Sequence, residues 1–104
     1  MTCFKLINKV NENGDTIYSR MKRIDDRFDL AKFEDLIFTE NASSFYDIAG
    51  KAYPLESIYS IGVSKNKVLH LRVLDNNGNE HYPQVDSKNS NKIINYLNKN
   101  LCEN

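Results

Sequence analysis

The clearest signals of secondary structure lie in residues 68–101, VLHLRVLDNNGNEHYPQVDSKNSNKIINYLNKNL. Apolar and polar residues alternate over 68–74, which is typical of a strand with one buried face. The pair Asn77-Gly78 favours a type I′ turn, because both central residues of that turn need a positive φ angle. Residues 80–85 then form the returning strand. The stretch therefore predicts a β-hairpin followed by a closing helix.

The two-residue turn also predicts which residues face each other in this hairpin. Val73 lies opposite Tyr82 on one face, and both histidines, His70 and His81, lie on the other. The histidines are four residues out of direct register, about 13 Å apart at roughly 3.3 Å per residue. That distance is too long for a shared metal ion. The sequence predicts no catalytic residues, no metal site and no cofactor.

The closing helix is predicted over residues 87–101, with Asp86 or Ser87 as its N-cap. Its asparagines are poor helix formers, so burial of an apolar stripe must hold it. The stripe consists of residues at helical spacing: Ile93, Ile94, Leu97 and Leu101.

A second hairpin is predicted near the N-terminus, from residues 4–10 and 16–23 around Asn13-Gly14. With Asn13 and Gly14 as the loop residues, apolar side chains face apolar ones across the strands. The predicted pairs are Val10 with Ile17 and Leu6 with Met21.

Residues 25–40 change in character, because aspartates precede apolar residues at helical spacing. Aspartates at a helix start satisfy free amide groups and suit the helix dipole. We expect a short helix from about Asp26 or Asp29 to about Phe38, with Leu30, Phe33 and Ile37 on one face. A strand over residues 36–39 is the alternative, since periodicity over so short a run does not separate the two.

Composition limits the classes of protein to consider. A chain of 104 residues is one domain by length, and its 40% hydrophobic content is that of a globular protein. The formal net charge is zero. This excludes a polyanion binder that relies on a strong basic excess. It does not exclude a local basic patch.

The two cysteines, Cys3 and Cys102, stand at opposite ends of the chain and lack metal-type spacing. The N-terminal residues lack the apolar run of a signal peptide, and no stretch is apolar enough to span a membrane. We therefore expect the cytoplasm, with reduced thiols. A bridge between the two cysteines stays open, because the termini of a domain often lie close together.

Carboxylates gather in residues 25–47, where seven acidic side chains stand against two basic ones. One interpretation is helix capping and a solvated face. The other is an acidic surface that engages a basic protein, by mimicking nucleic acid. The second predicts partner-binding residues Asp25, Asp26, Asp29, Glu34, Asp35 and Tyr46.

Basic side chains on the first hairpin provide an alternative function. A sheet face that combines basic and aromatic residues is a common way of holding single-stranded nucleic acid. The residues concerned are Lys5, Lys9, Tyr18, Arg20, Lys22 and Arg23. Lysines that only solvate an exposed strand and discourage edge pairing explain the same pattern.

Residues 54–101 resemble the end of a bacterial pleckstrin-homology-like domain. Ile58 and Ile61 correspond to a short I-x-x-I segment that leads into a hairpin with a glycine turn, which a capped helix follows. The resemblance implies a curved antiparallel barrel or rolled sheet that the helix closes. The predicted helix at 29–38 departs from that pattern. Lipid binding is not implied, because residues 11–15 lack the basic motif of lipid-binding members.

The sequence thus predicts an α+β fold. Its expected parts are an antiparallel curved sheet or partly open barrel, one short internal helix and a C-terminal closing helix. The expected function is that of a small non-enzymatic intracellular protein-binding module, such as an immunity protein or a phage-type inhibitor that acts by occlusion. Binding of nucleic acid is the alternative function. No membrane is expected as a partner, and a homo-oligomer stays open.

Overall fold

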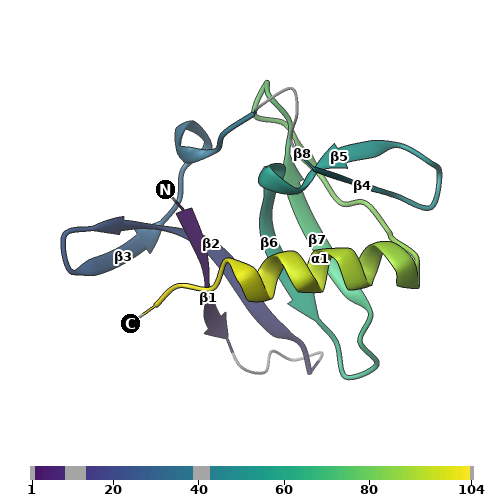
Figure 1. Ribbon diagram of the computed structural model, residues 1–104, viewed down its shortest axis with the longest axis horizontal. Coiled ribbons are helices and arrows are strands. Elements are labelled where there is room, and N and C mark those ends of the chain that lie inside the picture. The colour runs from purple at the N-terminus through teal and green to yellow at the C-terminus, as the bar shows by residue number, and fades with distance from the viewer. Residues whose placement is uncertain (1, 9–13, 39–42, 104) are drawn as a thin grey trace.

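One six-stranded antiparallel sheet organises the chain (Figure 1). The computed structural model describes residues 2–8, 14–38 and 43–103. The strand order is β1–β2–β6–β7–β8, with β3 also paired to β2. The strands are β1 (Thr2–Asn8), β2 (Thr16–Ile24), β3 (Arg27–Leu30), β6 (Ile58–Val63), β7 (Leu69–Leu74) and β8 (Glu80–His81).

The remaining elements lie around this sheet. A two-stranded sheet consists of β4 (Ser44–Tyr46) and β5 (Ala52–Pro54), and projects from the main sheet on the side opposite to β3 (Figure 1). Two short 3-10 turns are η1 (Phe33–Asp35) and η2 (Leu55–Ser57). The helix α1 (Ser87–Lys99) crosses one face of the main sheet. The α+β class and the C-terminal helix are therefore confirmed.

The core lies between α1 and the sheet. Asp86 caps the helix, because its carboxylate accepts a hydrogen bond from the Asn89 N–H at 2.9 Å. Ile93 and Leu97 are buried against the strands. The buried cluster comprises Phe4, Phe45, Leu55, Ile58, Ile61, Leu69, Leu71, Val73, Ile93 and Leu97. Burial of these side chains at roughly 1.5–3 kcal/mol each is the main favourable contribution to folding.

The predicted helix over 87–101 is too long by two residues. The helix ends at Lys99, and Leu101 forms a parallel bridge with Phe4 of β1. The Phe4 N–H donates to the Asn100 carbonyl at 2.7 Å, and the Cys102 N–H donates to the Phe4 carbonyl at 2.8 Å. The C-terminal residues therefore extend the sheet at β1. The sheet is not closed into a barrel, since, within the described residues, β8 lies at one end and β1, with the bridged C-terminal residues, at the other.

The first hairpin exists, but its predicted register is wrong by three residues. Phe4 pairs with Arg20 and Leu6 pairs with Tyr18, with an irregularity before Asn8. The physical reason is burial: this register places Phe4 in the core, where its ring meets that of Tyr96 at 6.0 Å. Asn13 of the predicted turn and Val10 of the predicted first strand lie outside the described residues.

The second hairpin is also present, with a register that differs from the prediction by one residue. Val73 pairs with His81 rather than with Tyr82. The cause is Asp75, whose carboxylate accepts the N–H groups of Asn77 and Asn79, both at 2.9 Å. This closes a three-residue loop, in which Gly78 takes the positive φ angle of 83°. A one-residue shift moves every following side chain to the other face.

The helix predicted over 29–38 is wrong. Residues 27–30 form β3, which pairs with the outer half of β2 so that Phe28 lies opposite Arg23. Asp25 takes a positive φ angle of 57° in the turn that joins them. Only η1 is helical, and Asp35 accepts the Lys32 N–H there at 2.7 Å. Strand pairing outweighs the helical spacing of so short a segment. The alternative strand at 36–39 is absent over 36–38, and residue 39 lies outside the described part.

A disulfide joins Cys3 of β1 to Cys102, with 5.0 Å between their Cα atoms. The expectation of two reduced thiols is therefore wrong for this structure. The main-chain hydrogen bonds between Phe4 and residues 100–102 bring the two cysteines together. Among the described helices, none has the length and apolar character needed to span a membrane.

Candidate functional site

The β2–β3 hairpin projects from one end of the molecule, and η1 follows it in the chain (Figure 1). We call residues 25–38 the arm, and this segment carries most of the predicted acidic side chains. Asp25 and Asp26 are exposed at its turn, and Glu34 is exposed on η1. Asp29 forms an ion pair with Arg27 at 3.0 Å. Five carboxylates and two cations occupy the arm, so the predicted acidic surface is concentrated there.

Asp35 is the most constrained of these carboxylates. It accepts the Lys32 N–H at 2.7 Å and lies 3.4 Å from the Lys22 ammonium group. These contacts, the backbone hydrogen bond first, lower the pKa of the Asp35 carboxyl below its usual value. Asp35 is therefore negatively charged at neutral pH.

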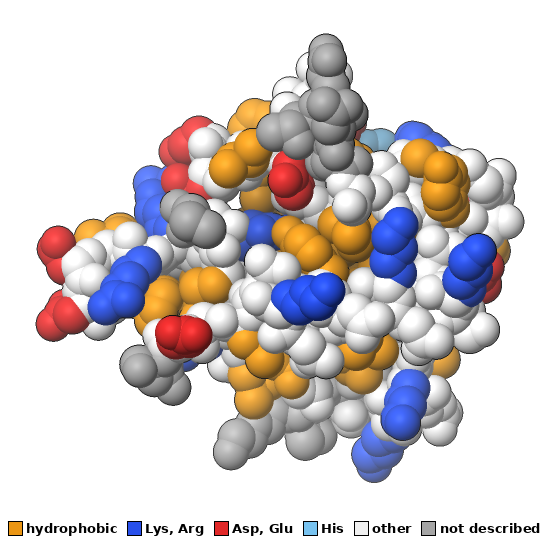
Figure 2. Space-filling view, in the orientation of Figure 1, with side chains coloured by type: hydrophobic (Ala, Val, Ile, Leu, Met, Phe, Trp, Pro, Cys, Tyr) orange, Lys and Arg blue, Asp and Glu red, His pale blue; other side chains and the backbone are white. Residues whose placement is uncertain are grey.

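Large apolar side chains of the arm are also exposed, which the sequence interpretation missed. Their exposed fractions are 53% for Leu30, 39% for Phe33, 57% for Ile37 and 36% for Phe38. Leu30, Phe33 and Ile37 were expected to be the buried stripe of a helix. They lie on β3, on η1 and after η1, and each is exposed to solvent instead. Figure 2 shows apolar and acidic side chains next to one another on this end of the molecule. Grouped exposed apolar side chains are typical of interaction surfaces.

Tyr46 does not belong to this surface. It lies on β4, where its N–H donates to the Asn89 side chain at 3.0 Å. The β4–β5 sheet and the arm project from opposite sides of the molecule (Figure 1). The structure thus brings five of the six predicted partner-binding residues onto one arm and leaves out Tyr46.

Arg20 cannot contribute to a basic surface, because it is 96% buried, with 4% of its area exposed. Its guanidinium group lies 4.4 Å from the centre of the Phe4 ring. It donates hydrogen bonds to neutral oxygens on four other segments: Ile58 O (2.7 Å), Thr2 Oγ1 (2.8 Å), Tyr96 Oη (3.0 Å) and Leu55 O (3.4 Å). Arg20 therefore joins the sheet to α1, and its predicted place on the exposed face of the first hairpin is wrong.

The other predicted basic residues do not form a continuous patch. Lys22 is paired with Asp35, and Tyr18 packs against the core. The Lys5 ammonium group lies 5.5 Å from the centre of the Phe28 ring, which also has Arg23 beside it at 5.9 Å. Lys9 lies outside the described residues. The alternative nucleic-acid surface is reduced to Lys5 and Arg23, which both lie beside Phe28.

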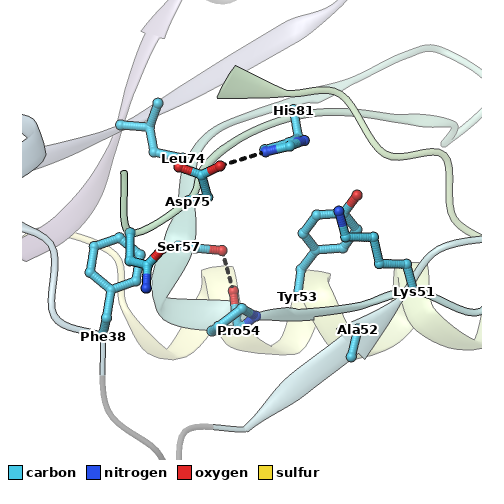
Figure 3. A pocket seen from close by; sticks show the side chains of 10 residues that line it. Phe38, Lys51, Ala52, Tyr53, Pro54, Ser57, Leu74, Asp75 and His81 are labelled. Atoms are coloured by element: carbon cyan, nitrogen blue, oxygen red, sulfur yellow. Dashed lines mark hydrogen bonds and ion pairs between the residues drawn. The ribbon is translucent and has the colours of Figure 1, made fainter. Parts of the chain in front are cut away.

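A pocket of about 390 Å³ opens beside the arm (Figure 3). Its lining comes from β5 and η2, from the β7–β8 turn and from Phe38 at the end of the arm. The lining residues are Phe38, Lys51, Ala52, Tyr53, Pro54, Ser57, Leu74, Asp75, Asn76 and His81. Figure 3 shows Phe38 and Tyr53 on opposite sides, with the Asp75–His81 pair at one edge. The volume falls in the range of small-ligand pockets.

The polar edge of the pocket is a histidine–carboxylate pair. His81 Nε2 lies 3.0 Å from Asp75 Oδ2, and both side chains are about one-third exposed. The hydrogen bond from His81, followed by those from the N–H groups of Asn79 and Asn77, lowers the pKa of Asp75 to about 2. The sequence did not predict the pair, because its register depends on the Asp75 loop.

We expect the Asp75 carboxyl to titrate with a midpoint near pH 2 instead of its ordinary value of about 3.9. Because the pKa is lower in the folded state, the stabilising effect is complete above about pH 4 and is lost as the pH falls towards 2. Carbon NMR of the side-chain carboxyl would measure this. The Asp75→Asn variant should lose this part of the acid dependence of unfolding. A carboxyl that titrates near pH 4 would show that the pair does not form in solution.

The two histidines point to opposite faces of the sheet, so the prediction that they share a face is wrong. His70 pairs with Gly62 on the face away from α1, whereas His81 pairs with the buried Val73. His70 lines a separate hollow of about 540 Å³ on that outer face. Within residues 2–8, 14–38 and 43–103, no group of side chains could hold a metal ion.

No protein-family model matches the chain, and no curated protein or solved structure matches it either. The resemblance to pleckstrin-homology-like domains therefore stays a prediction.

Proposed function

We propose that this protein is a protein-binding module and that the arm, residues 25–38, is its contact surface. The observation that carries the proposal is that large apolar side chains stand exposed among carboxylates on one projecting segment. Apolar contacts supply affinity, and complementary charge steers association and excludes wrong partners. The partner that fits is a protein surface with basic side chains around apolar ones.

Nucleic acid is the weaker candidate. The buried Arg20 and the Lys22–Asp35 pair remove two of the expected phosphate contacts. The arm also carries five carboxylates, and these would repel a phosphate backbone.

We also propose that the protein acts by occluding its partner, as an immunity protein or an inhibitor does. We propose in addition that it catalyses no reaction. A histidine held by a carboxylate can serve as a general base, so the Asp75–His81 pair is the feature that would favour catalysis. Ser57 is the one serine among the described lining residues, and its hydroxyl is the candidate nucleophile. Ser57 is buried, however, and its hydroxyl donates to the Pro54 carbonyl at 2.6 Å. A binding role fits this arrangement better.

We also make a proposal for the compartment in which the protein resides. The sequence predicts the cytoplasm, but disulfides persist mainly in oxidising compartments. The bridge between Cys3 and Cys102 therefore supports an oxidising compartment over the cytoplasm.

Changing the apolar side chains of the arm should weaken binding strongly. The Leu30→Ser/Ile37→Ser variant removes two exposed side chains without altering the core. For a partner identified by cross-linking in the native host, we expect an affinity at least about tenfold lower, which corresponds to about 1.4 kcal/mol. Calorimetric titration of the two purified proteins measures it.

The matched control is the Ile48→Ser/Val68→Ser variant, which changes two similarly exposed apolar side chains away from the arm. It should bind as the wild type does. Equal affinities for the wild type and the arm variant, or a loss in the control alone, would refute the arm as the contact surface.

A further inference from the structure

The pocket beside the arm has one rigid aromatic wall. One face of the Tyr53 ring stacks on Phe45, with 5.6 Å between ring centres and 23° between ring planes. Phe45 is completely buried. Core packing therefore fixes Tyr53. Its ring also lies 6.0 Å from that of His81 and lines the pocket.

The second aromatic wall connects the pocket to the arm. The Phe38 ring lies 5.9 Å from that of Phe33 on η1 and faces Tyr53 across the opening (Figure 3). A partner that covers the apolar side chains of the arm would therefore also cover the mouth of the pocket.

A carboxylate stands at the edge between the two walls. The backbone N–H groups of Asn77 and Asn79 hold one oxygen of Asp75, and His81 holds the other. The carboxylate is thus fixed in position while about one-third of the side chain is exposed. Asn76 also lines the pocket.

The pocket already contains a cation of this chain. The Lys51 ammonium group lies 5.1 Å from the centre of the Tyr53 ring, within the range of a cation–π contact. Lys51 is exposed and bends over the ring in Figure 3. Its long flexible stem allows it to leave the ring at little cost, so another cation can take its place.

We propose that the pocket receives the guanidinium group of an arginine from the partner protein, which displaces Lys51 from Tyr53. The inference rests on the proposed function, in which the partner presents basic side chains to an acidic arm. Arginine matches the lining better than lysine does. Its planar group stacks on aromatic rings and hydrogen-bonds to carboxylate oxygens, and its stem packs on apolar side chains such as Leu74 and Pro54.

The test uses Nα-acetyl-arginine amide as the probe and the full-length chain labelled with ¹⁵N. The neutral control is Nα-acetyl-citrulline amide, which has nearly the same shape without the charge. We expect the arginine probe to shift the amide signals of Tyr53, Asp75 and Asn76, with an affinity at least about threefold higher than that of citrulline. Asp75→Asn should lower the arginine affinity by a similar factor.

The Lys51→Ala variant separates this proposal from a general apolar pocket. Removing the internal competitor should raise the affinity for the arginine probe about threefold, with little change for citrulline. Equal binding of the two probes, or an arginine affinity that does not rise in Lys51→Ala, would overturn the proposal.

These outcomes are independent of the arm as a protein-binding surface, because the probe needs no partner protein. Arginine binding in the pocket, combined with an unchanged partner affinity in the Leu30→Ser/Ile37→Ser variant, would refute the proposed function alone. Loss of partner binding in that variant, without arginine binding in the pocket, would refute the pocket proposal alone.

Discussion

Replacing Arg20 with alanine should lower the free energy of unfolding by about 3–5 kcal/mol. The guanidinium group donates to the Leu55 and Ile58 carbonyls and to the hydroxyls of Thr2 and Tyr96. Its removal leaves buried acceptors without donors, and hydrogen bonds from charged groups are worth more than neutral ones. Denaturant unfolding followed by circular dichroism measures the change.

Arg72→Ala is the matched control. The Arg72 guanidinium group forms an ion pair with Glu80 and, like that of Arg20, lies near an aromatic ring, 5.1 Å from the centre of the Tyr59 ring. Its side chain is 43% exposed, so its loss should cost no more than about 1 kcal/mol. If the two variants were equally stable, Arg20 would not join the sheet to α1 as described.

Removal of the Cys3–Cys102 disulfide should have the second large effect. The bridge spans 99 residues of sequence, so it restricts nearly the whole unfolded chain. In the chain-entropy account, a loop of that length contributes roughly 4–5 kcal/mol to stability. Denaturant unfolding of the wild type with and without a reducing agent should show this difference.

The Cys3→Ser/Cys102→Ser variant is the control for the reducing agent itself. It should unfold at the same low denaturant concentration in both conditions and match the reduced wild type. If the native protein instead presented two thiols that react under non-reducing conditions, the bridge and the oxidising compartment would both be contradicted.

The C-terminal half of the fold was largely predictable because its local patterns agree with its tertiary contacts. The alternation around Leu71 and the stripe of Ile93 and Leu97 specify a strand and a helix that cover each other. The Asp86 cap was visible for the same reason, since a capping side chain acts on residues next to it in sequence.

Registers were not predictable, because they depend on single side chains that are remote in sequence or act within a loop. Asp75 adds one residue to the second turn by accepting two N–H groups. In the first hairpin, Phe4 sets the register by packing against Tyr96, more than ninety positions away in the chain. A prediction that assumes a two-residue turn takes neither of these side-chain effects into account.

The sequence predicted which types of residue make up the candidate site, but it did not predict how they are arranged in space. The sequence grouped the carboxylates that the structure places on the arm, whereas Tyr46, a tyrosine from the same segment of sequence, lies on β4. Arg20 looked like a surface residue because its type is seldom buried. Its burial follows from facing Phe4 across β1 and β2, which the wrong register concealed.

We have proposed that the arm, residues 25–38, is the surface that contacts a protein partner. Hydrogen exchange of the backbone amides, measured in the free protein and in the complex with the purified partner, tests it most directly. We predict added protection over residues 25–38 and at the mouth of the pocket around Phe38 and Asp75, with none on β4. Protection confined to β4 and β5, or to the outer face around His70, would contradict the claim.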